Sequence, residues 1–137
     1  MYLGKTPQFI QSLFPNYTWR IPTSEKVLYL TFDDGPIPDV TPWVLEQLAQ
    51  YDAHATFFCV GDNIRKHPEV FEQVVQHGHA VGNHTFNHLN GWVTDDIPYF
   101  HNVRHCATLA QHSVLFRPPY GKLKPKQAQF LQRHYRI

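Results

Sequence analysis

Short apolar runs alternate with amphipathic stretches from residue 25 onward, and this alternation constrains the fold more than any other feature of the sequence. Strand-like runs occupy 27–32, 55–60, 80–82 and 114–116. Helical patterns follow at about 39–51, 67–77, 97–111 and 124–134, and 135–137 resembles the opening of a fifth strand. Alternating strands and helices favour a parallel sheet with right-handed crossovers, and uniformly apolar strands favour one covered on both faces. The pattern predicts an α/β fold of four βα units and the start of a fifth strand.

Residues 1–22 precede this pattern, and we expect them to form an N-terminal lead-in to a main domain at 23–137. Thr6 is a candidate N-cap for a short helix with Pro7 at its first position, and Pro15 would end that helix. We expect the helix to pack on the main domain. A helix lying on a membrane surface is less favoured, because the segment is short and carries few basic residues.

Composition excludes several classes of protein. Twelve basic and eleven acidic residues give a net charge of +1, so nucleic-acid binding is not expected. The apolar runs fall far short of the ~20 residues that a transmembrane helix needs. The first residues show no charged stretch followed by an apolar one, so we expect no signal peptide, which favours a cytoplasmic location. Cys59 and Cys106 do not make a disulfide framework, and Cys59 is expected to be a buried thiol.

Unusual polar residues follow three of the predicted strands. They are Asp33 and Asp34 after the first strand, His84 and His88 after the third, and Arg117 and Tyr120 after the fourth. The carboxyl ends of the strands form the functional edge of barrels and open α/β sheets. We therefore expect these side chains to lie close together.

Histidine is frequent, with ten in 137 residues, and it is the commonest metal-binding side chain. His84 and His88 have the i, i+4 spacing that places two imidazoles on one side of a helical turn. His101 and His105 have the same spacing inside a predicted helix, where a solvent-facing pair is the simpler interpretation. The position of His84 and His88 just after a strand makes them the better candidates for metal ligands.

The carboxylates and the arginine each allow two interpretations. Asp33 and Asp34 before Gly35 are compatible with a plain turn. They are also compatible with a site in which one carboxylate joins two histidines on a metal while its neighbour faces the reacting water. Arg117 is compatible with a rigid surface turn, or with a fixed cation that holds a carboxylate ionised and oriented.

Three segments together resemble a known family. Thr31-Phe-Asp-Asp-Gly-Pro36, His84-Thr-Phe-Asn-His88 and Arg117-Pro-Pro-Tyr120 are similar, in order and spacing, to the first three motifs of the polysaccharide deacetylases. This is carbohydrate esterase family 4, also called the NodB-homology domain. Ala55-Thr-Phe-Phe is similar to that family's second strand, and the resemblance covers about residues 25 to 137.

The resemblance implies a distorted (β/α) barrel that removes N-acetyl or O-acetyl groups from a chitin-like or peptidoglycan-like glycan. By the family's motifs, Asp34, His84 and His88 would bind a divalent metal, most often Zn²⁺. Asp33 would be the general base for a metal-bound water, and Arg117 would pair with Asp33. The backbone N–H of Tyr120 would help to stabilise the oxyanion.

The resemblance does not extend to the family's last two motifs, an aromatic wall with a carboxylate and a leucine–histidine pair that supplies the catalytic acid. His134 is no substitute, because it falls on a predicted helix ahead of the fifth strand. A closed barrel usually needs ~200 residues or more. We therefore expect the missing half of the barrel to come from further C-terminal sequence or from another chain.

Three alternative functions stay open from the sequence. The same fold could hydrolyse another non-peptide amide or imide, or it could be a catalytically inactive sugar- or metal-binding module that lacks the acid. A separate metal site at His101 and His105 would need Asp95 or Asp96 as its carboxylate.

The family's polymeric substrates favour the cell envelope, which competes with the cytoplasmic location stated above.

Overall fold

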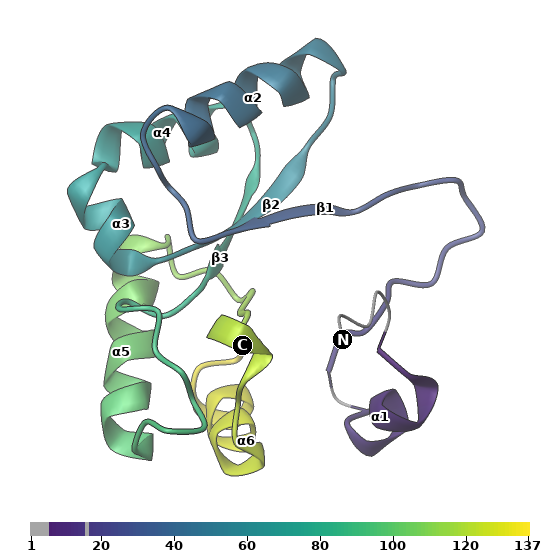
Figure 1. The fold of residues 1–137 in the computed structure, drawn as a ribbon, viewed down its shortest axis with the longest axis vertical. Coiled ribbons are helices and arrows are strands. Elements are labelled where there is room, and N and C mark those ends of the chain that lie inside the picture. The colour runs from purple at the N-terminus through teal and green to yellow at the C-terminus, as the bar shows by residue number, and fades with distance from the viewer. Residues whose placement is uncertain (1–5, 16) are drawn as a thin grey trace.

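Three parallel strands form the centre of the molecule. In the computed structural model, which describes residues 6–15 and 17–137, β1 (Leu30–Asp33), β2 (Ala55–Cys59) and β3 (Ala80–Asn83) form one sheet in that order (Figure 1). Phe32 pairs with Phe57, and Phe57 pairs with Val81 across the next ladder. All three strands therefore end at the same edge, as the alternating pattern predicts.

Helices follow each strand. Their bounds are α1 Gln8–Leu13, α2 Val40–Gln50, α3 Gly61–Lys66, α4 Pro68–Gln76, α5 Asp96–Leu109, the 3-10 turn η1 Pro119–Gly121 and α6 Pro125–His134. Proline in the first turn helps to start α4 and α6, because a first-turn N–H has no partner within its helix. The fold class, α/β with parallel strands, is confirmed.

The side chains of β2 point alternately to the two faces of the sheet. Ala55, Phe57 and Cys59 join a buried cluster with side chains from α2, α3, α4 and α5. Phe58 points to the opposite face, because successive side chains of a strand alternate. Three residues of β1 are exposed and one is partly buried, so the expectation that every strand is covered on both faces is wrong for β1.

Several predicted elements differ in the structure. The run 114–116 forms only one isolated bridge, between Asn83 and Phe116, because Pro118 and Pro119 follow at once and proline has no N–H for a ladder. Residues 135–137 form no strand, since no full fourth strand lies beside them. The stretch directly after β2 forms the helix α3, which is not among the helical patterns of the sequence. Gly61 is needed there, since an added Cβ would lie 2.6 Å from the Phe86 ring.

The lead-in segment is also different from the prediction. Pro7, and not Thr6, is the N-cap of α1. No residue of α1 is buried, and the helix stands apart from the sheet in Figure 1, so its expected packing on the main domain is wrong. Among the residues that the structure describes, no helix has the length and apolar character needed to cross a bilayer.

His79 is a buried polar side chain that lies directly before β3. Its Nδ1 accepts a hydrogen bond from the Ala55 N–H at 3.4 Å, and its ring packs on Phe57 with centroids 5.3 Å apart. Its Nε2 is buried and has no hydrogen-bond partner among the described residues. Burial, with smaller effects from His54 and His77, lowers the pKa of His79 below its ordinary value of 6.5.

We predict that His79 makes the fold less stable in acid. Because its folded-state pKa is lowered, the unfolded chain binds more protons below pH 6.5. The stability that neutral His79 contributes is present above that pH and is lost as the pH falls through the folded-state pKa. In denaturant unfolding at about pH 7 and about pH 5, the free energy of unfolding should fall less steeply in His79→Phe than in the wild type. The exposed His101→Phe variant is the control, and an equal fall in the His79 variant would contradict the prediction.

Candidate functional site

The carboxyl edge of the sheet brings three predicted metal ligands to one point. Asp34 follows β1, while His84 and His88 follow β3. The Nε2 atom of His84 lies 3.4 Å from Asp34 Oδ1, and the Nε2 atom of His88 lies 3.0 Å from the same oxygen. Among the described residues, these three form the one group whose candidate ligand atoms all lie within 4.8 Å of one another.

Four residues in and around this cluster have left-handed backbone conformations. Asp34, Thr85, His88 and Tyr120 have φ values of 69°, 61°, 55° and 60°. Such conformations are unfavourable for residues other than glycine and cluster at functional sites, where surrounding contacts hold them. The peptide bond between Gly35 and Pro36, just after Asp34, is cis.

Side-chain amides hold these turns. Asn63 Nδ2 donates to the backbone oxygen of Asp34 at 2.7 Å, and Asn83 Oδ1 accepts from the N–H of Thr85 at 2.9 Å. Asn102 on α5 accepts from two successive backbone N–H groups, those of Phe86 and Asn87, at 2.8 and 2.9 Å. Hydrogen bonds to Asn83 of β3 and to Asn102 of α5 therefore hold the loop between His84 and His88.

The hydrogen bonds of His84 determine which of its nitrogens is free. Its Nδ1 lies 2.7 Å from the backbone oxygen of Arg117, and a carbonyl can only accept, so Nδ1 carries the proton. Burial lowers the pKa of His84, against the raising effects of that hydrogen bond and of Asp33. The lone pair of Nε2 in neutral His84 is therefore directed toward Asp34 Oδ1, which also offers an electron pair. Two atoms that each offer an electron pair and lie 3.4 Å apart can both coordinate one cation placed between them.

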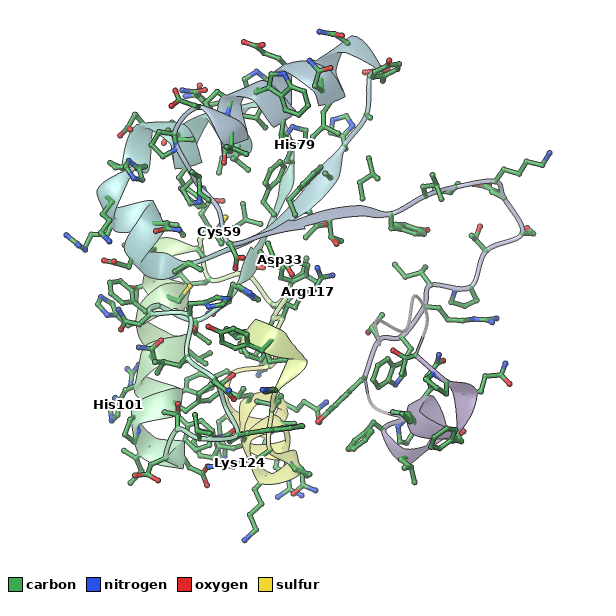
Figure 2. The ribbon with its side chains drawn as sticks, viewed as in Figure 1. Asp33, Cys59, His79, His101, Arg117 and Lys124 are labelled. Carbon is green, nitrogen blue, oxygen red and sulfur yellow. The ribbon has the colours of Figure 1, made fainter. Side chains whose placement is uncertain are left out.

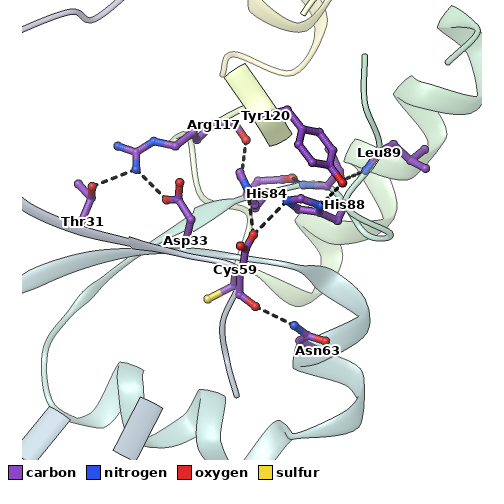
Figure 3. Close-up of polar contacts among 12 residues, drawn as sticks. Thr31, Asp33, Cys59, Asn63, His84, His88, Leu89, Arg117 and Tyr120 are labelled. Carbon is purple, nitrogen blue, oxygen red and sulfur yellow. Dashed lines mark hydrogen bonds and ion pairs between the residues drawn. The ribbon is translucent and has the colours of Figure 1, made fainter. Parts of the chain in front are cut away.

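His88 is held by Tyr120. The phenol oxygen of Tyr120 lies 3.2 Å from His88 Nδ1, and the two rings meet edge to face with centroids 4.7 Å apart (Figure 3). This leaves Nε2 of His88 directed at Asp34. A partner on the second ring nitrogen is the usual device that orients a metal-binding histidine.

Asp33 and Arg117 form the second half of the site. Arg117 Nη1 donates to Asp33 Oδ1 at 2.7 Å and to Thr31 Oγ1 at 2.9 Å (Figure 3). The guanidinium carbon also lies 4.1 Å from the centroid of the Phe58 ring. Thr31, Asp33 and Phe58 point to the sheet face opposite the main buried cluster, so Arg117 crosses that face and orients the Asp33 carboxylate there.

An open cavity of about 350 Å³ lies beside the cluster. Asp34 and His88 form one wall, and Asp62 and Asn63 of α3 form another. Its mixed lining of carboxylates, amides and two aliphatic side chains, Ile37 and Val60, suits a polar ligand with a small apolar part.

The other histidines do not join the site. Figure 2 shows His101 on α5, well away from Asp33 and Arg117. His105 stacks on Phe86 with centroids 3.8 Å apart, and Asp96 accepts a hydrogen bond from Gln127 at 3.0 Å. No group of His101 and His105 with a carboxylate converges among the described residues, so the alternative metal site is not formed. His134, at the end of α6, packs on Phe130.

The structure therefore brings together all six predicted site residues. The sequence did not reveal the supporting set, which includes Thr31, Asn63, Asn83 and Asn102. Of these, Asn83 carried a signal, since it stands directly before His84 at the end of a strand. Asn102 carried none, because its role depends on how α5 packs against the loop.

Comparisons with known proteins identify the family of this chain. A family model described as polysaccharide deacetylase matches residues 20–135. A peptidoglycan-N-acetylglucosamine deacetylase of Bacillus cereus is 41% identical over 108 residues, which cover 76% of this chain and 51% of that protein. A chitooligosaccharide deacetylase of Azorhizobium caulinodans is 48% identical over 71 residues, covering 52% of this chain and 34% of that protein.

Solved structures that resemble this chain are also deacetylases or carbohydrate esterases. The Bc1960 peptidoglycan N-acetylglucosamine deacetylase superposes with a TM-score of 0.80 at 29% identity, covering 83% of this chain and 56% of that one. A family 4 carbohydrate esterase from Streptomyces lividans, solved with acetate, gives a TM-score of 0.72 at 26% identity, covering 79% and 58%. The chain belongs to the polysaccharide deacetylase family. It spans about half the length of the Bacillus cereus relative and of the two solved structures, and about a third of the Azorhizobium relative.

We predict that the Tyr120 hydroxyl strengthens metal binding at this cluster. Tyr120→Phe removes the partner of His88 Nδ1 and should weaken Zn²⁺ binding about tenfold in a calorimetric titration. His84→Ala removes a ligand and should abolish that binding. The matched control is His101→Ala, whose imidazole lies outside the cluster. Binding that is unchanged in His84→Ala but lost in His101→Ala would contradict the assignment.

Proposed function

We propose that this protein hydrolyses N-acetyl groups on a glycan of the peptidoglycan or chitin type. One observation carries the proposal: the Asp33–Arg117 pair lies beside the convergent Asp34, His84 and His88. A site that served only to bind a metal would have no use for a second, separately oriented carboxylate. Family membership and the deacetylase relatives support the same class of reaction.

The residues present fit a divalent metal, and Zn²⁺ fits them best. Two imidazole nitrogens and one carboxylate oxygen are a common catalytic zinc set, and they leave a position for substrate or water. Asp34, His84 and His88 would hold the ion. When bound, it would polarise the acetyl carbonyl and make water more acidic.

Asp33 is the base in this proposal. Its Oδ1 is oriented by Arg117 at 2.7 Å, so the carboxylate has a fixed position from which to take a proton from the attacking water. The hydrogen bond from Arg117 to Thr31 keeps the guanidinium in place during this transfer. The backbone N–H of Tyr120 would then donate to the oxygen that becomes negative as the carbonyl carbon turns tetrahedral.

Residues 23–137 would form the N-terminal portion of the deacetylase domain. The relatives are about twice as long as the region matched here, so the remaining strands of the barrel and the acid would come from sequence outside these residues or from a second chain. In the proposed reaction, that acid protonates the sugar nitrogen as it leaves.

We predict that Asp33→Asn abolishes acetate release from oligomers of N-acetylglucosamine. The amide cannot take the proton, and loss of a general base costs about 10²–10⁴ in rate. Zinc affinity should stay close to that of the wild type, because Asp33 is outside the ligand set. Asp95→Asn is the matched control, since Asp95 caps α5 without a side-chain hydrogen bond. Acetate release that survives Asp33→Asn would remove Asp33 from the mechanism.

A further inference from the structure

Two large aromatic side chains stand exposed near the metal cluster. Tyr120 is 64% exposed and Trp92 is 60% exposed. Trp92 follows His88 by only four residues, so their Cα atoms are at most about 15 Å apart. The catalytic proposal uses Tyr120 but gives no role to Trp92.

The loop that carries Trp92 is fastened tightly. The N–H of Gly91 donates to the backbone oxygen of Lys122 at 3.1 Å, and a Cβ on Gly91 would lie 2.6 Å from that same oxygen. The fully buried Gln127 donates to the backbone oxygens of Gly91 and Thr94, at 3.1 and 3.4 Å. Lys124 Nζ donates to Thr94 as well, at 2.8 Å. The loop therefore holds Trp92 at the surface in a fixed position. Because this loop is already ordered, binding of a ligand to Trp92 costs little conformational entropy.

Residues 120–122 connect this indole to the metal site. Tyr120 contacts His88, and two residues later Lys122 places its ammonium 5.4 Å from the centroid of the Trp92 ring. The ammonium lies over one face of the indole, so the arrangement offers the remaining exposed surface of the indole together with a cation, on the loop that continues from His88. We call Trp92 and Lys122 the indole platform.

We propose that the indole platform binds a sugar unit of the glycan other than the one that is deacetylated. This rests on the function proposed above and identifies where the polymer continues. A β-linked pyranose carries a patch of C–H bonds with a slightly positive surface, and the face of an indole is negative, so the two attract. The Lys122 ammonium has three N–H donors for the hydroxyls at the ring edge. A short substrate that fills only the metal site would not reach the platform.

The test compares substrates of different length. Acetate release from the dimer and the hexamer of N-acetylglucosamine is measured with the wild type, Trp92→Ala and Trp92→Phe. For the hexamer, Trp92→Ala should raise KM about tenfold with little change in kcat, because a Trp side chain that a bound ligand covers is a typical binding hot spot. The dimer should be unaffected, and Trp92→Phe should restore most of the affinity.

Trp43→Ala is the matched control. Trp43 is 59% exposed, like Trp92, but it lies on α2 beside a separate hollow lined by Leu30 and Phe32. Circular dichroism confirms that each variant is folded. Equal effects of Trp92→Ala and Trp43→Ala, or a Trp92→Ala effect that is the same for dimer and hexamer, would overturn the platform.

A binding measurement separates this inference from the proposed reaction. If the wild type releases no acetate from either substrate, this chain does not carry out the proposed reaction by itself, and calorimetric binding of the hexamer then tests the platform directly. Weaker binding by Trp92→Ala than by Trp43→Ala would support the platform as a glycan site. Equal binding by the two variants would overturn it.

Discussion

The site depends on one short backbone contact, the bridge between Asn83 at the end of β3 and the chain at residues 115–117. The N–H of Asn83 donates to the oxygen of Leu115 at 2.8 Å, and the N–H of Arg117 donates to the oxygen of Asn83 at 3.0 Å. These two bonds place Arg117 directly beside the start of the metal-binding loop. Its carbonyl then fixes His84, and its side chain fixes Asp33. One residue thus sets the position of His84, a proposed metal ligand, relative to that of Asp33, the proposed base.

Part of the support for the site comes from helices that lie outside the strands. Asp33, Asp34, His84 and His88 stand at strand ends, where parallel pairing alone brings them to one edge. Two of the amides that hold their turns come from helices, Asn63 from α3 and Asn102 from α5, while Asn83 ends β3 itself. The backbone at Asp34 and the loop before His88 are therefore held in part by helices outside the sheet.

The sequence was sufficient to predict which polar side chains lie together at the edge of the sheet, because strand ends and histidine spacing are local patterns. The pairing of Arg117 with Asp33 was reached only through the family resemblance, and the structure shows the ion pair at 2.7 Å. Local patterns failed where the outcome depended on neighbours. Residues 114–116 have strand composition, but only one bridge forms before the prolines. Trp92 and Gln127 gave no signal, since their roles come from contacts between segments more than 25 positions apart.

The convergence of Asp34 and His84 also links metal supply to folding. These two ligands are fifty positions apart in the chain, so an unfolded molecule cannot present them together. Any ion that needs both therefore binds the native state in preference, and its binding free energy is added to the stability of the fold. The amount of folded protein would then follow the free concentration of that metal in its surroundings. A metal bound at the proposed site would therefore also act as a link between two distant parts of the chain that holds the fold together.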